Sequence, residues 1–474
     1  MIGTRPGSRR RRSRSFRRCA VLAGTAFLAS CVLSEPNLPG SDPSTPGVVL
    51  IVVDTLRADH LSQYGYSRAT SLALEFFSRQ ATLFEQCYAP ASWTTPSTAS
   101  ILTGLLPMRH GAELRGAALD LEATTLAEIL RDEGFATLGV SFNHNITRTT
   151  AFDQGFSILL DFEGESSEYP DIAKMRATAR DLLKTSTRPF FLYLHPMNVH
   201  GPYLTPEEHL SDLLGSPPGK EFRYSKSLMD SIMKKGRLER RGEVTALHLQ
   251  SHRDQYDTAI RYSMDQIARV FGDLQEAGLY ENSVIVLTAD HGEELYDHQG
   301  FGHGYTLYEE LLRVPLWIKL PNQRNPRVIE EPVSLTDLLP TILEVLDLTV
   351  PEHLDGRSLA GLLNHGIDET VRERVFVSET RWPGRFEGSS VLAYPWKLIH
   401  VESNYEGREA DDLLYHLVED PLEQNDVANE HAEVVERLTG LLEESRQAAG
   451  ASLRSEDVSE KMNEDLLKAL GYDE

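Results

Sequence analysis

Three stretches of the chain are continuously apolar, which is typical of strands buried on both faces of a parallel sheet. They cover residues 48–53, 190–194 and 283–288. Segments with helical periodicity lie between or beside them, at residues 125–133, 172–184 and 256–278. Alternating strands and helices predict an α/β fold, with a mixed, mostly parallel sheet between helices.

The pattern changes in the last hundred residues. Short predicted strands at 390–393 and 397–401 are followed by a predicted helix at 432–444. We therefore expect a large domain over residues 48–370 and a smaller α+β subdomain over residues 371–474. Residues 207–253 are charged and rich in turn formers, so they are either an insertion near a site or a solvated excursion.

Polar residues follow the three apolar stretches. Asp54 ends the first, Asp290 and His291 follow the third, and His195, Asn198 and His200 follow the second. Ligands of open α/β sheets bind outside the carboxyl ends of the strands, so we expect a site there. Two carboxylates and an imidazole suit a divalent metal. The alternative is that each aspartate only caps a loop.

A candidate nucleophile, Thr94, precedes Thr95, Pro96 and a helix-compatible run that Gly104 closes. Proline at a helix start and glycine past its end place Thr94 at a helix N-terminus, where the macrodipole stabilises an alkoxide. A metal held by Asp54, Asp290, His291 and Thr94 would activate the hydroxyl. A plain capping threonine is the alternative.

Two further histidines complete the predicted chemistry. His200 and His303 are placed to bind the outer oxygens of an anion or to protonate a leaving group. The alternative for His303, which lies between two glycines, is a hydrogen bond within a turn.

Residues 1–30 read as a signal peptide. They hold eight arginines and no acid, and the apolar stretch 19–30 is too short to span a bilayer. Leu28, Ala29 and Ser30 precede Cys31, which resembles the lipobox of bacterial lipoproteins. We expect lipidation of Cys31, a tether over residues 31–47 and an exported envelope protein, on the outer membrane in a double-membraned cell. Ordinary signal-peptide cleavage is the alternative.

Charge and cysteine content narrow the picture further. Removal of residues 1–30 takes the formal net charge from −24 to −32, which disfavours a nucleic-acid partner. Cys87 would be the one cysteine left for the fold, so no internal disulfide is expected and Cys87 should be buried.

Several segments in order resemble the sulfatase family of the alkaline phosphatase superfamily. The matching segments are 52–66 (VVDTLRADHLSQYGY), 92–111 (SWTTPSTASILTGLLPMRHG), 191–203 (FLYLHPMNVHGPY), 288–304 (TADHGEELYDHQGFGHG), 307–318 (LYEELLRVPLWI), 354–359 (LDGRSL), 413–428 (LLYHLVEDPLEQNDVA) and 469–472 (ALGY). The resemblance implies one divalent metal ion and a small C-terminal subdomain. It also implies metal ligands at Asp54, Asp290 and His291, the nucleophile position at Thr94, and anion contacts at His200, His303, Arg109, His110 and Asn198.

The chain departs from the sulfatase pattern at four positions. Thr94 stands where sulfatases have the Cys or Ser that becomes formylglycine, Thr98 replaces an arginine, and Thr55 replaces an aspartate. His291 replaces the asparagine of calcium-dependent members, which favours Mn²⁺ or Zn²⁺ over Ca²⁺. The metal ligands are similar to those of phosphonate monoester hydrolases, and the threonine to that of lipoteichoic acid synthases and phosphoethanolamine transferases.

Three functions are consistent with these residues. The first is a hydrolase or transferase in which Thr94 attacks a phospho- or sulfo-ester of a small molecule, glycan or lipid. The second is a sulfatase that works without formylglycine, and the third is a non-catalytic anion-binding lipoprotein.

Overall fold

The apolar stretches of the sequence form one central sheet in the computed structural model. The structure describes residues 45–161, 171–185, 189–203, 205–215, 244–366, 374–404 and 411–450, so the predicted signal peptide and Cys31 lie outside the described residues. Within them the sheet contains, in spatial order, β10 (Arg327–Ile329), β2 (Thr82–Tyr88), β9 (Arg313–Lys319), β6 (Ser283–Ala289), β1 (Gly47–Val53), β5 (Phe190–His195), β3 (Ala136–Ser141) and β4 (Ile158–Asp161), with β11 (Val333–Ser334) beside β2.

Most neighbouring strands in this sheet are parallel, and only β9 runs antiparallel to its neighbours β2 and β6. The central strands β1, β5 and β6 are buried along their whole length. Parallel strands need crossover helices, and these cover both faces, which explains the continuous apolar runs. The predicted mixed, mostly parallel sheet between helices is confirmed.

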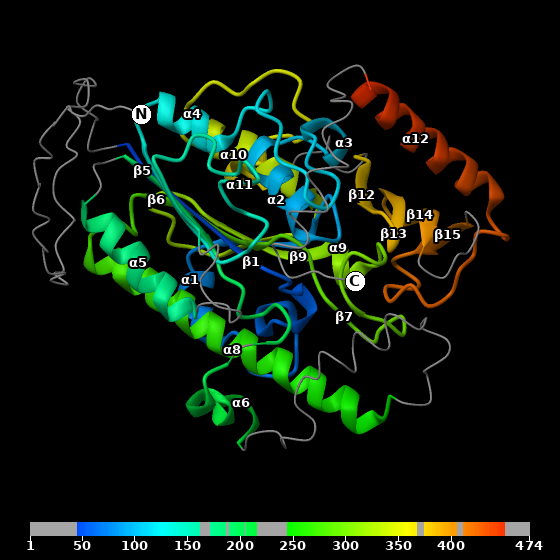
Figure 1. Ribbon diagram of the computed structural model, residues 1–474, viewed down its shortest axis with the longest axis horizontal. Helices are drawn as coiled ribbons and strands as arrows, with labels where there is room; N and C mark the ends of the chain where they lie inside the picture. Colours follow the sequence, from blue (N-terminus) through cyan, green and yellow to red (C-terminus); the bar gives the residue numbers. More distant parts are fainter. Residues whose placement is uncertain are drawn as a thin grey trace, which may run out of the picture. The chain divides into compact units, whose positions relative to one another are not determined.

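Helices lie on both sides of the sheet (Figure 1). The long helices α5 (Ile172–Thr185) and α8 (Ala246–Glu276) run side by side on one face. The other face carries α2 (Thr94–Thr103), α4 (Leu126–Asp132), α10 (Leu338–Val345) and α11 (Ala360–His365). Short helical turns in the connections are η1 (Ala58–His60), η2 (Ser62–Tyr64), η3 (Leu72–Leu74), α1 (Glu75–Ser78), α3 (Pro107–His110), η4 (Glu207–His209), α6 (Ser211–Leu214), α9 (Glu309–Leu312) and η6 (Leu335–Asp337). None of the described helices has the length and hydrophobicity that a membrane span needs.

Helix α8 begins ten residues before the sequence prediction of Tyr256. Thr245 caps it, because its hydroxyl accepts a hydrogen bond from the His248 amide at 3.2 Å while the His248 ring accepts one from the Thr245 amide. This reciprocal cap satisfies two N–H groups of the first turn. The predicted insertion therefore ends before Thr245, and residues 216–243 of it lie outside the described residues.

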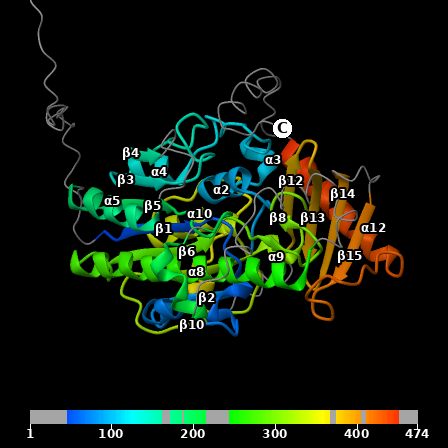
Figure 2. The same ribbon diagram turned by 60° about the horizontal axis from the view of Figure 1, so that its bottom comes forward.

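The C-terminal part forms a second, antiparallel sheet. Its strands, in order, are β12 (Phe376–Trp382), β13 (Phe386–Ala393), β14 (Trp396–Asn404) and β15 (Asp411–His416). Helix α12 (Ala432–Gly450) lies along it (Figure 2) and packs Leu438 and Leu442 against apolar side chains of β13, β14 and β15. A separate two-stranded ribbon joins β7 (Glu294–Leu295) to β8 (Phe301–Gly302).

The outer edge of β12 runs along the segment just before α2. The Glu379 amide donates to the Pro90 carbonyl at 2.8 Å, the Ser378 hydroxyl donates to the Ala89 carbonyl at 2.7 Å, and the Ser92 amide donates to the Thr380 hydroxyl at 3.0 Å. These bonds satisfy an otherwise exposed strand edge. They also fix the approach to Thr94.

A buried polar cluster joins the second sheet to α9. The Lys397 ammonium is 1% exposed and lies 2.9 Å from a carboxylate oxygen of Glu309 and of Glu423. Beside it, the two ring nitrogens of His298 face Glu310 Oε1 at 2.7 Å and the Glu423 carbonyl at 3.0 Å. Burial alone would lower the pKa of His298, but the Glu310 carboxylate and the Glu423 carbonyl raise it to about 9.

Candidate active site

Three central strands deliver buried polar residues to one edge of the sheet. Asp54 follows β1, Asp290 and His291 follow β6, and His195 ends β5, and all four side chains are 0% exposed. The carboxyl ends of parallel neighbours meet there, which is why residues far apart in sequence come together. The structure thus places the predicted metal-binding residues in one cluster.

The two aspartates each have one satisfied and one unsatisfied oxygen. Asp54 Oδ2 accepts from the Asn143 amide at 2.5 Å and lies 3.2 Å from His195 Nε2, and Asp290 Oδ1 accepts from the backbone amides of His291 and Thr55 at 2.9 and 3.3 Å. Asp54 Oδ1 and Asp290 Oδ2 are buried and have no hydrogen-bond partner among the described residues. Buried oxygens of this kind indicate that a cation belongs between them.

The pKa values of Asp54 and Asp290 also indicate a cation between the two carboxylates. Burial would raise the pKa of Asp54, but the hydrogen bond from His195 and the charges of neighbouring histidines lower it overall. The pKa of Asp290 is raised by burial and by the nearby charge of Asp54. Two like charges in a dry site repel, and a divalent ion would remove that cost.

Hydrogen bonding distinguishes the roles of the two histidines beside the aspartates. His291 Nδ1 lies 2.8 Å from the Gly292 carbonyl, which can only accept, so the proton is on Nδ1 and Nε2 has a free lone pair. His291 Nε2 lies 3.5 Å from Asp290 Oδ2 and 4.0 Å from Asp54 Oδ1. Burial also lowers the pKa of His291 to about 4, which keeps the ring neutral, as a ligand must be.

His195 has the opposite arrangement. Asp54, His195 and Asp290 each offer one ligand atom, and these three atoms lie within 4.8 Å of one another. Distance alone would therefore allow His195 to be a metal ligand. Its Nε2, however, faces Asp54 Oδ2 at 3.2 Å, and its Nδ1 lies 2.7 Å from the Tyr193 hydroxyl. An ionised carboxylate only accepts, so Nε2 carries the proton. His195 therefore orients the Asp54 carboxylate and does not bind the metal itself.

Thr94 is the first residue of α2 and is 3% exposed. Its hydroxyl oxygen lies 3.3 Å from His291 Nε2 and accepts from the Asn143 side-chain amide at 3.3 Å. Because His291 Nε2 is unprotonated, the Thr94 hydroxyl donates to it. The helix N-terminus adds its positive dipole end at the same oxygen. This arrangement suits a hydroxyl that loses its proton.

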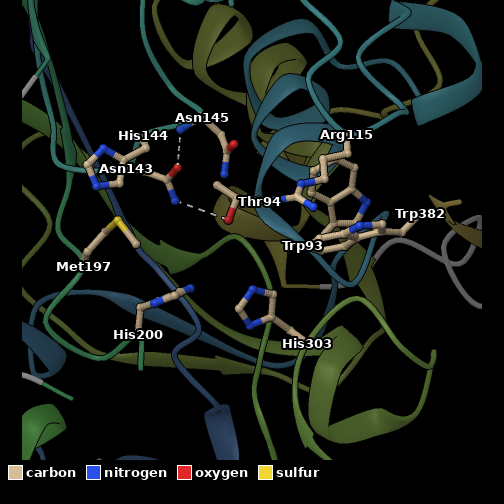
Figure 3. A pocket seen from close by; sticks show the side chains of 10 residues that line it. All are labelled: Trp93, Thr94, Arg115, Asn143, His144, Asn145, Met197, His200, His303 and Trp382. Carbon is tan, nitrogen blue, oxygen red and sulfur yellow. Dashed lines mark hydrogen bonds between the residues drawn. The ribbon is translucent and has the colours of Figure 1, made fainter. Parts of the chain in front are cut away.

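Asn143 fixes the Thr94 hydroxyl and the Asp54 carboxylate at once. Its side-chain oxygen accepts from the Asn145 amide at 2.7 Å, which settles the amide orientation and turns Nδ2 toward Thr94 (Figure 3). The same Nδ2 donates to Asp54. The sequence analysis missed Asn143. It follows β3, whose mixed composition lacks the continuous apolar run from which the other strands were predicted.

Thr94 lies at the base of a pocket (Figure 3). The space between its walls, open to solvent, is about 450 Å³. The lining residues are Trp93, Thr94, Arg115, Asn143, His144, Asn145, Met197, His200, His303 and Trp382. Amide, imidazole, guanidinium and indole groups dominate, so the pocket suits a polar, anionic ligand with an apolar face.

His200 and His303 stand side by side on the wall of the pocket, with ring centroids 5.0 Å apart. His303 is also 4.5 Å from the His291 ring, and its Nδ1 lies 3.2 Å from Glu293 Oε1. His200 Nδ1 faces the Gly201 carbonyl at 2.7 Å, so the proton of the neutral ring is on Nδ1. Both histidines are therefore within the site that the sequence predicted for them, and their catalytic roles stay predictions.

The other predicted anion contacts lie outside the pocket. His110 is 0% exposed, and its ring bonds the Ser100 hydroxyl and the Ala112 amide at 3.1 and 3.2 Å. The Arg109 guanidinium pairs with Asp355 at 2.8 Å, and the Asn198 side-chain oxygen accepts from the Ile172 amide at 2.9 Å. None of the three lines the pocket, and their roles as substrate contacts stay predictions.

Thr55 stands where the sulfatase pattern has an aspartate, and its backbone rather than its side chain contributes to the site. It has a positive φ of 59°, which is strained for a β-branched residue, and its hydroxyl donates to the Asp54 carbonyl at 2.7 Å. The strained turn aims its backbone amide at Asp290. The backbone of Thr55 therefore orients one carboxylate, although its side chain offers none.

The chain matches two models of known protein families. The family model described as "Sulfatase" matches residues 46–348, and the model described as "N-sulphoglucosamine sulphohydrolase, C-terminal" matches residues 297–448. Arylsulfatase K of Xenopus laevis is 24% identical over 452 residues, which cover 85% of this chain and 82% of that protein.

Two solved structures share the fold. One is described as a complex with the substrate D-glucosamine-2-N,6-O-disulfate, and it has a TM-score of 0.71, 18% identity and coverage of 88% of this chain and 100% of that one. The other is the phosphonate monoester hydrolase of Agrobacterium radiobacter, with a TM-score of 0.69, 21% identity and coverage of 85% and 96%.

Proposed function

Because the chain belongs to the sulfatase family of ester hydrolases, we propose that it hydrolyses a sulfate or phosphate monoester by attack of Thr94. One observation carries the proposal. The Thr94 hydroxyl is held at the start of α2 by His291 and Asn143, next to two buried carboxylates that each lack a partner for one oxygen. A nucleophile, an activating cation site and an anion pocket thus coincide.

One divalent ion fits the unsatisfied groups. Asp54, Asp290, His291 and Thr94 would hold it, and a nitrogen ligand among oxygens favours Mn²⁺ or Zn²⁺ over Ca²⁺. When bound, such an ion lowers the pKa of a coordinated hydroxyl and offsets the charge of the ester oxygens.

The reaction then proceeds by two successive displacements at sulfur or phosphorus. Thr94 Oγ1 gives its proton to solvent and forms a bond to sulfur or phosphorus, while the bond to the leaving oxygen breaks; it takes a proton back from solvent at the end of the cycle. His200 or His303 gives that oxygen a proton, and the same histidine then takes one from water. The water oxygen displaces Thr94, which releases the inorganic anion and restores the hydroxyl. A threonine ester cannot collapse as a formylglycine hydrate does, so this second displacement is required.

The substrate we favour is the ester of a sugar. A similar fold is described with a disulfated glucosamine as its substrate, and the Thr94 pocket offers indole faces and side-chain amides, which suit a ring with hydroxyl groups.

The test compares rates on nitrophenyl sulfate, phosphate, phosphate diester and phosphonate, with Mn²⁺, Zn²⁺ or Ca²⁺ in turn. Thr94→Ala should lower kcat on the preferred ester by at least about a thousandfold. The matched control is Thr103→Ala on the same helix, whose hydroxyl bonds only local backbone and should leave kcat within about twofold.

Each alternative predicts a different result. Sulfate turnover that survives Thr94→Ala would mean that a water molecule is the nucleophile and that the enzyme is a sulfatase without formylglycine. Transfer to an added alcohol at the expense of hydrolysis would make it a transferase. Binding of sulfate or phosphate without turnover of any ester, with every metal, would leave only an anion-binding protein.

We also propose that Cys31 is lipidated and anchors the enzyme in the cell envelope. The proposal rests on the basic and apolar residues before Leu28, Ala29, Ser30 and Cys31. Labelled palmitate should enter the wild-type protein and not Cys31→Ser. Equal labelling of both proteins would refute it.

A further inference from the structure

Two tryptophans and two arginines gather on one side of the Thr94 pocket. Trp93, Arg115 and Trp382 line it on the side of Thr94 away from Met197 (Figure 3). The ring centroids of the two tryptophans are 5.1 Å apart. The Arg115 and Arg385 guanidinium carbons lie over the Trp382 ring, 5.3 and 4.0 Å from its centroid. The group is thus an aromatic platform that carries two cations.

The platform is built into the backbone. Trp382 ends β12, whose edge is bonded to residues 89–92, so the strand and the start of α2 share one frame. Gly304, at a φ of 75°, passes so close that a Cβ there would be 2.6 Å from Trp382 Cε3. Its amide also donates to the Ser92 carbonyl at 2.9 Å. Three chain segments therefore hold Trp382 in place beside His303.

Arg385 has a positive charge that the fold does not use. Within the described part of the chain, no carboxylate is within 4.0 Å of its guanidinium nitrogens, and it stacks instead on Trp382 and Tyr305. By contrast Arg381, in the same hairpin, is 3.6 Å from Glu113. Stacking covers the face of a guanidinium and leaves its N–H edge for an anion.

A second unused donor belongs to the same wall. The indole nitrogen of Trp93 is buried and has no acceptor among the described residues, although Trp93 lines the pocket. A buried donor without an acceptor is costly unless a ligand supplies one. Cations and an unpaired N–H thus meet beside the reacting group, in a chain whose net charge is −24.

We propose that Arg115 and Arg385, held over Trp382, bind a second anionic group of the substrate. The preferred substrate is then a sugar ester with another sulfate, phosphate or carboxylate on the same ring or the next one. This inference rests on the proposed function of the Thr94 pocket. The acidic surface should repel long polyanions, so a short ligand is preferred over an extended polymer.

The experiment uses pairs of sugar esters that differ by one anionic group: glucosamine 6-sulfate with glucosamine-2-N,6-O-disulfate, and glucose 6-phosphate with glucose 1,6-bisphosphate. For the wild-type enzyme, KM for release of the 6-group should be about tenfold lower with the doubly charged member. Arg385→Gln should reduce this KM ratio to within about twofold of unity. Arg381→Gln, the matched control, should keep the wild-type ratio.

A purely structural role would give a different pattern, because a misplaced wall lowers kcat for both members of a pair alike. An unchanged KM ratio in Arg385→Gln would therefore overturn the proposal. A lower KM for nitrophenyl esters than for either sugar would also overturn it, since the platform would then stack a neutral aromatic group.

Binding separates this inference from the proposed function. Calorimetry on Thr94→Ala should show about tenfold tighter binding of the disulfate than of the monosulfate, and this preference should disappear in Thr94→Ala with Arg385→Gln. If no ester is hydrolysed but the preference is present, the subsite stands and the proposed function fails. If both esters bind equally while turnover is normal, the subsite is wrong and the function stands.

Discussion

The paired aspartates predict that Asp290→Asn stabilises the metal-free protein and loses most of the stabilisation that metal gives. The substitution keeps an oxygen to accept from the His291 and Thr55 amides, and it replaces the unpaired Oδ2 by a neutral amide. In the metal-free protein, two unit charges within 4.8 Å repel by about 3 kcal/mol at an effective dielectric constant of about 20. Partial protonation reduces this cost, so we expect Asp290→Asn to raise the free energy of unfolding by about 1–3 kcal/mol.

Metal offsets this gain, because it stabilises the wild-type protein more than the variant. At a free metal concentration a hundred times its Kd, binding stabilises the wild-type protein by about 2.7 kcal/mol. Loss of a carboxylate ligand should weaken binding by about a hundredfold, so the same concentration would stabilise Asp290→Asn by only about 0.4 kcal/mol.

The assay is urea unfolding in EDTA and in Mn²⁺, Zn²⁺ or Ca²⁺. Asp337→Asn is the matched control, because Asp337 is equally buried but pairs with Arg374, with both oxygens 2.6 Å from guanidinium nitrogens. That variant should lose stability in every buffer and keep the full metal effect. If Asp290→Asn also loses stability in EDTA, Asp290 is a structural carboxylate. If it keeps the full stabilisation by metal, Asp290 is not a ligand.

Three further predictions concern the elements around the site. Lys397→Met leaves two buried carboxylates without their cation, so urea titration should show a loss of about 3–5 kcal/mol, and a loss below about 1 kcal/mol would contradict the burial of the cluster. The folded-state pKa of His298 is raised to about 9, so its contribution to the free energy of unfolding is complete below pH 6.5 and disappears as the pH rises through 9. Over that pH range the wild-type protein should lose up to about 3 kcal/mol more stability than His298→Gln. Parallel pH profiles of stability for the two proteins would refute this. Gly304→Ala should displace Trp382, which should change the tryptophan fluorescence and raise KM while stability falls only slightly. An unchanged spectrum and an unchanged KM would show that the turn accommodates the methyl group.

Sequence periodicity located the chemical centre well, because strand ends are visible in a sequence. Asp54, Asp290 and His291 each follow an apolar run, and the structure brings them together at one sheet edge. Asn143 was missed because β3 contains Thr137, Gly139 and Ser141 and lacks a continuous apolar run. A mixed composition hides a buried strand from this kind of pattern.

Proximity in sequence to the nucleophile helix does not place a residue in the lining of the pocket. Arg109 and His110 follow the nucleophile helix closely, yet α3 turns them away from the pocket. Arg109 instead meets Asp355, which lies 246 positions further along the chain. The charge of an arginine says nothing about its partner when that partner comes from a distant segment.

The position of Trp382 in the pocket wall could not be predicted from the sequence either. Thr380 and Ser92 are 288 positions apart, and their hydrogen bond, with its neighbours along β12, brings Trp382 to Thr94. No local pattern around Trp382 indicates a site, because it is the last residue of an ordinary strand of the second sheet. The two carboxylates that we propose as metal ligands therefore follow strands of one sheet, whereas Trp382, which we expect to help choose the substrate, comes from another sheet. Substitutions in the second sheet can then alter substrate preference while the metal-binding residues and Thr94 keep their positions, which is a route by which one catalytic core serves different esters.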